Sequence, residues 1–366
     1  MKRNAVMETT SLLPSTRPGC VPVDDRHARR PLTIQCRGAS CMSPATAAAA
    51  ALLAIGLFTA ASGPALAQAY PSKPVRIIVP LAPGGGNDSV ARLVGQKMSE
   101  NIGQTVIVEN RAGAGGVIAS EFVSRAPPDG YTLYLVSTSF TAAPALHSKL
   151  AFDTLKDFTP ITRLSTVPGA LTVHASMPVQ SVQALLALAR ARPGEITYGS
   201  AGIGSGSHFA GELFKLASGV RLLHVPYKGS SLVTTALLSG EIMVSFSNPV
   251  SAMPHLKAGR LRVLGVTSAQ RWPLLPQFPS VAEAGVRGYE LLIWNGMATP
   301  AGTPPAVLTR LHAELTKVMG MPEVIDRLAA DGSRPRIERP EEFAAFLKDE
   351  VARWQKVIKA SDISRQ

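Results

Sequence analysis

The segment VRIIVPLAPGGGND, at residues 75–88, decides the fold of this chain. Its first six residues are rich in β-branched side chains and predict a buried strand, because continuous Val and Ile runs suit a sheet covered on both faces. The glycines at 84–86 predict a loop, and Asn87 and Asp88 are favourable N-caps for a following helix. A glycine-rich turn before a helix presents backbone N–H groups and the positive end of the helix dipole. The segment therefore predicts an anion-binding loop.

The same arrangement recurs in the second half of the chain. The loop GSAGIGSGS at residues 199–207 follows a predicted strand and leads into a helix that begins near His208. Strands and helices alternate around both loops, which indicates βαβ units with parallel strands and right-handed crossovers. Two such sets predict an α/β protein with two lobes that face each other across a cleft.

We predict three helices at the end of the chain. Each begins with a proline, the residue favoured at the first position of a helix. Their ranges are Pro305–Met319, Pro322–Ala330 and Pro340–Ala360. Because the first lobe has only three predicted strands without this region, we expect the chain to cross to the second lobe and return. The predicted lobes are 68–168 plus 294–366, and 169–293. Two crossings form a hinge, which we expect near 168–170 and 292–295.

Residues 1–67 have the features of a presequence. An apolar run at 43–61 precedes Ala-Leu-Ala at 65–67, which is the pattern of a signal-peptidase site and predicts a mature N-terminus at Gln68. The run is too short and too rich in Ala to be a good membrane anchor. Residues 1–41 form an unusually long leader, which we interpret as a misassigned translation start or as part of the cleaved segment. We therefore expect export to the periplasm.

Composition excludes several classes of function. All three cysteines lie in the presequence, so the mature chain has no disulfide, no reactive thiol and no cysteine for lipid attachment. The presequence also carries seven Lys and Arg against three Asp and Glu, which leaves the mature chain near +8. Its basic residues are scattered and its aromatic residues few, which argues against nucleic-acid binding. The histidines have no metal-ligand spacing, so we expect neither a metal nor a cofactor.

Nine motifs occur in order along the chain. They are YPSKP (70–74), the glycine loop (80–88), VENRAGAGG (108–116), DGYTL (129–133), the second glycine loop (198–213), HVPYKG (224–229), the segment 258–268, PSVAEAG (279–285) and PAGTP (300–304). Together they resemble the Bug family, the periplasmic solute receptors of tripartite tricarboxylate transporters. The resemblance covers nearly all of residues 70–360.

The resemblance implies a type II, Venus-flytrap binding protein that captures a small carboxylate. In the family both loop–helix elements, here 82–88 and 200–208, hold the ligand through backbone N–H groups, hydroxyls and bound water. The family often has Asp-Asn where this chain has Ser247 and Asn248, which argues against an amino-acid ligand. We expect a monomer that meets membrane transporter subunits transiently.

The predicted ligand contacts lie on the two loops and at the carboxyl ends of nearby strands, where open α/β sheets bind ligands. They are Gly84, Gly85, Gly86, Asn87, Asp88, Ser139, Ser200, Ala201, Gly204, Ser205, Ser207, His208, Ser247 and Asn248.

Several alternatives remain open at this stage. His208 could serve an exported hydrolase or isomerase, but the loop has Gly204 where a nucleophile elbow needs Ser, and no acid and nucleophile accompany the histidine. Asp88 could simply cap its helix, and Arg111 could face an anion or solvent. Trp294 is expected in the core. The receptor could also feed a sensor rather than a transporter.

Overall fold

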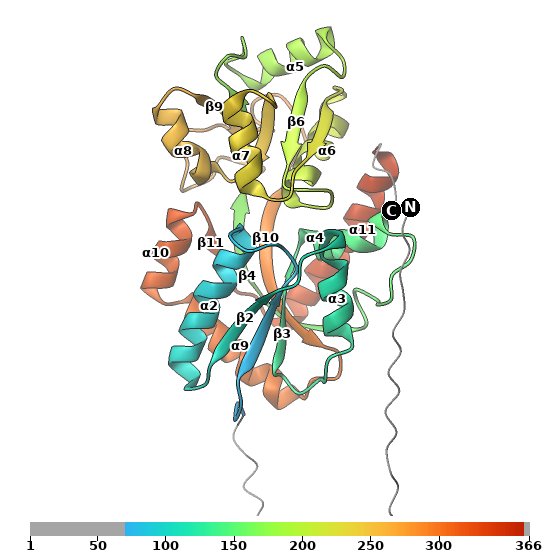
Figure 1. The fold of residues 1–366 in the computed structure, drawn as a ribbon, viewed down its shortest axis with the longest axis vertical. Helices are drawn as coiled ribbons and strands as arrows, with labels where there is room; N and C mark the ends of the chain where they lie inside the picture. The colour runs from blue at the N-terminus through green and yellow to red at the C-terminus, as the bar shows by residue number, and fades with distance from the viewer. Residues whose placement is uncertain (1–69, 362–366) are drawn as a thin grey trace, which may run out of the picture. The chain divides into compact units, whose positions relative to one another are not determined.

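The structure is a computed structural model that describes residues 70–361, except for the side chains of Val250 and Ser251. The predicted presequence and its cleavage site lie outside these residues. The described residues all belong to one compact unit. Within it the strands build two separate sheets, each covered by helices (Figure 1).

The first sheet has the strand order β11-β4-β10-β3-β1-β2. Strands β1, β2 and β3 are parallel, as predicted, whereas β10 runs antiparallel to both β3 and β4. The sheet is therefore mixed rather than purely parallel. Its strands are β1 (Val75–Val79), β2 (Val106–Asn110), β3 (Thr132–Ser137), β4 (Phe158–Pro168), β10 (Leu292–Pro300) and β11 (Arg334–Pro335).

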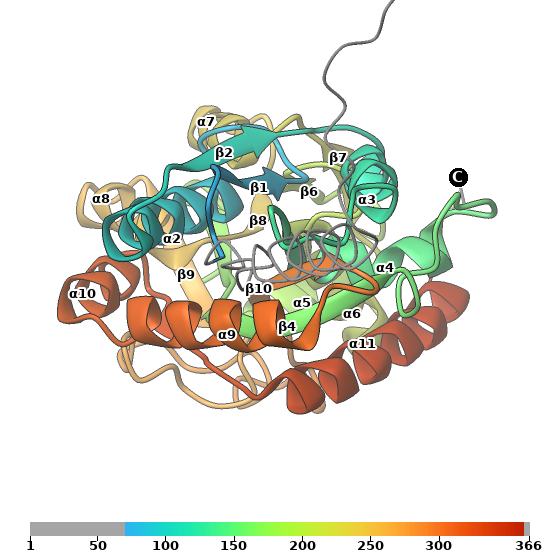
Figure 2. The same cartoon turned by 90° about the horizontal axis from the view of Figure 1, so that it is seen from below.

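Helices cover both faces of this sheet. Helix α2 packs against β1, β2 and α9, while α3 lies against β1 and β3. Helices α9 and α11 both contact β4, as the view from below shows (Figure 2). The helices are α2 (Gly86–Ile102), η1 (Ala114–Gly116), α3 (Val117–Ser124), α4 (Thr138–Leu146), α9 (Pro305–Met319), α10 (Pro322–Ala330) and α11 (Pro340–Ala360). The three C-terminal helices have the predicted bounds.

The second sheet has the order β7-β6-β8-β5-β9, with β6 parallel to β7 and β8, and β5 antiparallel to β8 and β9. Its strands are β5 (Ala170–His174), β6 (Thr197–Ser200), β7 (Leu223–Pro226), β8 (Val244–Ser247) and β9 (Leu261–Val266). Its helices are α5 (Val182–Ala191), α6 (Gly206–Ser218), α7 (Ser230–Ser239) and α8 (Pro249–Lys257).

The chain changes from the first sheet to the second at Gly169, between β4 and β5, and returns between β9 and β10. One buried side chain joins the two crossings. The Thr267 hydroxyl accepts a hydrogen bond from Gly169 N at 2.7 Å and donates to the Leu291 carbonyl at 2.6 Å. The two connecting segments are thus bonded to each other through a single residue.

Helix α11 packs against the hydrophobic clusters of both sheets. Near its start Phe343 lies in the cluster that contains Trp294 of β10, whereas Trp354 lies in the cluster of the second sheet, 4.3 Å from the ring of Phe209. Between them the buried Glu350 carboxylate accepts the indole N–H of Trp294 at 3.2 Å and that of Trp354 at 3.1 Å. Trp294 is a core residue, as expected.

Candidate ligand-binding site

The first glycine loop ends in an uncapped helix N-terminus. Gly85 is the N-cap, with φ −87° and ψ 171°, and α2 begins at Gly86. The prediction that Asn87 or Asp88 caps this helix is therefore wrong, since they are its second and third residues. Within the described chain no side chain caps α2. The first-turn N–H groups, at residues 86–88, have no intrahelical acceptor and suit an anion.

The Asp88 side chain holds this loop in place through hydrogen bonds. Its carboxylate, 4% exposed, accepts hydrogen bonds from Gly84 N at 3.0 Å, Arg92 Nε at 2.9 Å and Asn110 Nδ2 at 2.9 Å. Burial alone would raise the pKa of Asp88, but these hydrogen bonds, led by that from Arg92, lower it below its usual value. The carboxylate is thus ionised and occupied by protein donors, which gives Asp88 a bracing role.

The space around the glycines is open. A Cβ added at Gly84 or Gly86 would meet no atom within 4 Å, and one at Gly85 would meet only the Ala82 carbonyl at 3.8 Å. Of the three, Gly84 alone has a positive φ, +83°. Nearby, Asn87 Nδ2 is buried and has no hydrogen-bond partner among residues 70–361. The loop therefore combines unpaired donors with room for a ligand.

The second loop, between β6 and α6, is more strongly braced. Three of its backbone N–H groups donate to side chains of the loop and of the first turn of α6. They are Ala201 N to Ser207 Oγ at 3.0 Å, Gly202 N to Ser200 Oγ at 3.2 Å, and Gly204 N to His208 Nδ1 at 3.2 Å. Ser205 is the N-cap of α6 and accepts from His208 N at 3.3 Å. The N–H groups of Gly206 and Ser207 remain as first-turn donors without an intrahelical acceptor.

His208 belongs to a stack of rings that the sequence did not predict. The imidazole of His224, from β7, lies 4.3 Å from that of His208 and 4.8 Å from the ring of Tyr198. His224 Nε2 also lies 2.6 Å from Ser200 Oγ. Burial lowers the pKa of His208 to about 3 and that of His224 to about 4. Both rings are neutral at pH 7.

Two contacts place the second loop against helix ends of the first sheet. A Cβ at Gly115, in η1, would lie 3.6 Å from the Ile203 carbonyl. A Cβ at Gly204 would lie 3.3 Å from Leu146 Cδ1, at the end of α4. The second loop therefore meets the β2–α3 turn and α4, while the space beside the glycines at 84–86 stays open.

Ser139 lies at the start of α4, beside β3. Its hydroxyl is 3.2 Å from that of Ser137, the N-cap, and 3.7 Å from a Cβ placed on Gly116. The neighbouring Thr138 hydroxyl is buried without a partner among the described residues. Because β1, β2 and β3 are parallel and each leads into a helix, the N-termini of α2, α3 and α4 lie at the same edge of the sheet.

The residues that follow β8 differ in their contacts. Ser247 donates to Ser245 at 3.3 Å, whereas Asn248 Nδ2 donates to the Asp331 carbonyl at the end of α10 at 3.1 Å. The Asn248 amide thus bonds to a segment beside the other sheet.

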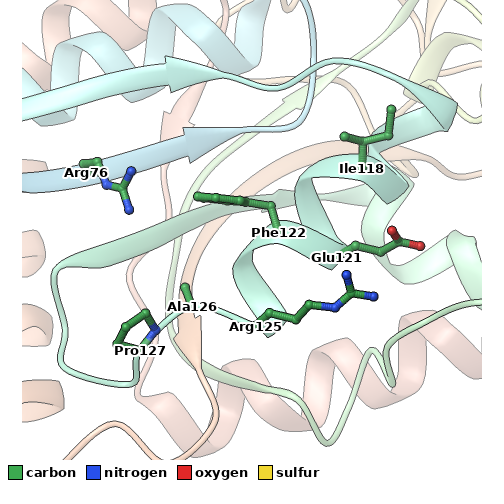
Figure 3. Close-up of a pocket in the computed structure, with 7 residues that line it drawn as sticks. All are labelled: Arg76, Ile118, Glu121, Phe122, Arg125, Ala126 and Pro127. Atoms are coloured by element: carbon green, nitrogen blue, oxygen red, sulfur yellow. The ribbon is translucent and has the colours of Figure 1, made fainter. Parts of the chain in front are cut away.

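Arg111 does not face the loops. It pairs with Glu109 at 2.6 Å and its guanidinium lies over the Phe122 ring at 3.6 Å. Phe122 also lines a surface pocket on α3 (Figure 3), which shares no residue with the predicted site. The pocket residues are Arg76, Ile118, Glu121, Phe122, Arg125, Ala126 and Pro127.

Within residues 70–361 no group of His, Cys, Asp and Glu side chains could hold a metal ion. The same residues contain no helix that is long and apolar enough to cross a membrane.

Two motifs contain bracing residues that the sequence did not single out. Asn110 lies in VENRAGAGG and His224 in HVPYKG, but their partners are 22 and 24 positions away along the chain, at Asp88 and Ser200. Only the folded chain shows these pairs.

The two sheets, with a loop–helix element at the edge of each, define a two-lobed solute-binding protein. A family model described as tripartite tricarboxylate transporter family receptor matches residues 90–363. The UPF0065 protein in the tcbD-tcbE intergenic region of Pseudomonas sp. (strain P51) is 39% identical over 307 residues, covering 84% of this chain and 91% of that protein. Protein BugT of Bordetella pertussis is 34% identical over 313 residues, covering 84% of this chain and 96% of that protein. The chain belongs to the tripartite tricarboxylate transporter receptor family, which includes the Bug proteins.

Solved structures agree with this family and fold. Rpa4515 of R. palustris with adipate has a TM-score of 0.75 and 37% identity, covering 80% of this chain and 98% of that one. MatC from Rhodopseudomonas palustris with bound malate has a TM-score of 0.72 and 30% identity, covering 79% and 100%. The periplasmic binding protein BugD has a TM-score of 0.73 and 32% identity, covering 81% and 100%. These proteins are binding receptors, so the predicted fold class and the prediction of a non-enzymatic receptor are confirmed.

Proposed function

We propose that this protein is a periplasmic receptor that binds a small mono- or dicarboxylate between its two lobes and delivers it to a tripartite membrane transporter. Support comes from Rpa4515 and MatC, proteins similar to this chain whose structures hold adipate and malate. The signal-peptide pattern at 43–67 and the periplasmic relative BugD support export. N-terminal sequencing of the exported protein tests this part: it should begin at Gln68, and retention of residues 1–60 would contradict export by cleavage.

The observation that carries the proposal is the uncapped N-terminus of α2. Its first-turn N–H groups and the buried amide of Asn87 are donors without protein partners in the described chain, beside open space. The dipole of a 17-residue helix adds positive potential there. Because the Asp88 carboxylate is balanced by Arg92 at 2.9 Å, it does not cancel that potential. A carboxylate matches these donors without needing a fixed cation in the site.

The second lobe supplies the other half of the site. The donor set of the β6–α6 loop consists of the N–H groups of Gly206 and Ser207 and one hydroxyl hydrogen of the Ser205–Ser207 pair, whose other hydrogen joins the two hydroxyls at 3.1 Å. A ligand that contacts both loops stabilises the closed arrangement, because only that arrangement lets both donor sets reach it. We take the lobes as 68–168 plus 294–366 and 169–293, with the last turns of α11 packed on the second lobe, and propose that closure turns about the crossings joined by Thr267.

Ser247 sets the expected selectivity. A ligand ammonium needs a carboxylate acceptor, and the only loop carboxylate described above, that of Asp88, already accepts three hydrogen bonds. We therefore expect weak binding of amino acids relative to their deaminated analogues.

Calorimetry with adipate, malate, succinate and aspartate tests the proposal, and the glycine loop provides a clean variant. Gly85→Ala keeps a permitted backbone conformation and meets no atom closer than 3.8 Å, so the fold should be unchanged. The new methyl group should weaken binding, since it occupies space beside the α2 donors. Gly103→Ala, at the other end of α2, strains a residue with φ +66° away from the site and so shows whether destabilising the helix alone changes binding. The proposal is refuted if none of these carboxylates binds the wild type, or if a folded Gly85→Ala variant binds them as the wild type does.

A further inference from the structure

We propose that His208 and His224 are positioning residues: a stacked pair of neutral imidazoles that holds the β6–α6 loop in its ligand-binding shape. The inference rests on the proposed function, because that loop forms half of the proposed site. It assigns a role to the only histidine of the second glycine loop and to a histidine on a neighbouring strand. Neither ring needs to touch the ligand for this role.

The first contact is the hydrogen bond from Gly204 N to His208 Nδ1 at 3.2 Å. A ring nitrogen that accepts a hydrogen bond carries no proton, so His208 is the neutral tautomer with its proton on Nε2. Gly204 has φ +80°, a conformation that glycine adopts readily. The imidazole therefore holds the tip of the loop by its backbone and leaves the N–H groups of Gly206 and Ser207 for the ligand.

The second contact holds the base of the same loop. His224 Nε2 lies 2.6 Å from Ser200 Oγ, and this hydroxyl accepts from Gly202 N at 3.2 Å. The two imidazoles stack at 4.3 Å with an interplanar angle of 26°. One ring thus supports residues 200–202 and the other supports residue 204, and their contact joins the two supports.

The charged groups around the stack leave the imidazoles neutral. Glu212 of α6 is 3% exposed, and its carboxylate accepts from Tyr198 Oη at 2.5 Å and pairs with Lys215 at 2.9 Å. Its oxygens are thus occupied by partners other than the rings. Burial lowers the pKa of both imidazoles; at His208 the neighbouring His224 and Lys215 lower it further, and at His224 Glu212 partly opposes the effect.

This arrangement has a chemical consequence. Protonation of His208 would place a hydrogen on Nδ1 against the N–H of Gly204, so the ring would repel the group that it now holds. The pKa of His224, about 4, lies above that of His208, about 3, so His224 would already carry a proton and two positive rings would stack 4.3 Å apart. The braced loop therefore requires His208 to stay neutral.

A pair of substitutions at one position separates the acceptor from the ring. His208→Asn keeps an acceptor close to the position of Nδ1 but loses the stack, whereas His208→Phe keeps a stacked ring and loses the acceptor. If the acceptor positions the loop, His208→Phe should weaken binding of adipate or malate by roughly two- to twelvefold, the value of one hydrogen bond, and His208→Asn should weaken it less. His174→Asn, at a half-buried histidine on β5, is the matched control and should bind as the wild type does. Equal binding by His208→Phe and wild type, or weaker binding by the Asn variant, would overturn the proposal.

Two measurements without ligand keep this test separate from the proposed function. Nitrogen NMR should find both imidazoles neutral at pH 6, with the proton of His208 on Nε2. Amide exchange at Gly204 should be at least tenfold faster in His208→Phe than in wild type or His174→Asn. A cationic ring at pH 6, or unchanged exchange, refutes the positioning role even if carboxylates bind. Confirmed NMR results with no carboxylate bound would refute only the proposed ligand class.

Discussion

Replacement of Asp88 by alanine is the sharpest single test of how the first glycine loop is held. The carboxylate joins the loop at Gly84, the helix at Arg92 and strand β2 at Asn110. The Arg92 side chain is 54% exposed, so its ion pair adds at most about 1 kcal/mol. The bonds from Gly84 N and Asn110 Nδ2 to a buried charge are worth more, about 1–2 kcal/mol each after partial rehydration of the exposed loop. Asp88→Ala should therefore lower the free energy of unfolding by about 2–5 kcal/mol.

Urea denaturation at pH 7 measures this change, with Asp349→Ala, an exposed acid in α11, as the control. The difference from wild type should also depend on pH in a stated direction. Because the folded-state pKa of Asp88 lies below its unfolded value, its stabilisation is complete above about pH 4 and is lost as the pH falls through the folded value. The difference in unfolding free energy between wild type and Asp88→Ala should thus become smaller as the pH falls below about 4. A loss of less than about 0.5 kcal/mol with an unchanged urea dependence would show that the carboxylate does not brace the loop.

Four further outcomes are expected. Glu350→Ala should destabilise by about 2–5 kcal/mol in urea denaturation, because two buried indole N–H groups lose their acceptor; a fully stable variant would contradict this. Gly296→Ala should cost at least about 1–3 kcal/mol, since its Cβ would lie 2.2 Å from Phe343 Cζ, and an unchanged melting temperature would show that the helix yields freely. Thr267→Val should lower the free energy of unfolding by about 1–3 kcal/mol, since Gly169 N loses its acceptor. If the variant shows the same ligand-induced change in small-angle scattering as the wild type, this hydrogen bond does not guide closure. Stability should be complete above about pH 6.5 and fall as the pH drops towards 4, because the unfolded chain binds protons that the two stacked imidazoles do not; thermal scans between pH 7 and 4 that show no such fall would contradict neutral rings.

The helix and strand pattern was largely readable from residue order. The local signals are the β-branched run before the first glycines, the second glycine-rich loop before a helix at 199–207, and the prolines that open α9, α10 and α11. The structure has the elements that these signals predict. Strand β4 and helix α4 were missed. Strand β4 contains two prolines and several polar residues, and it forms because β10 pairs with it from more than a hundred residues away. Helix α4 has a proline inside it, which hides it from helix patterns.

The sequence likewise predicted only part of the ligand-binding site. Glycine-rich turns before helices are a local signal for an anion-binding loop, so both loops could be predicted. The conformation inside them could not. Gly85, rather than Asn87 or Asp88, is the N-cap, because Asp88 is drawn into hydrogen bonds with Arg92 and Asn110.

The sequence by itself therefore determined most of the helices and strands, the two anion-binding loops and the family to which they belong, since each of these depends on residues that are neighbours along the chain. The tertiary structure alone decided which donors remain for a ligand. Gly84 N and Gly202 N donate to Asp88 and Ser200, and these two acceptors are held by Asn110 and His224. Parallel pairing places Asn110 and His224 beside the loops across β1–β2 and β6–β7. Sheet pairing creates those contacts, and no pattern along the chain contains them.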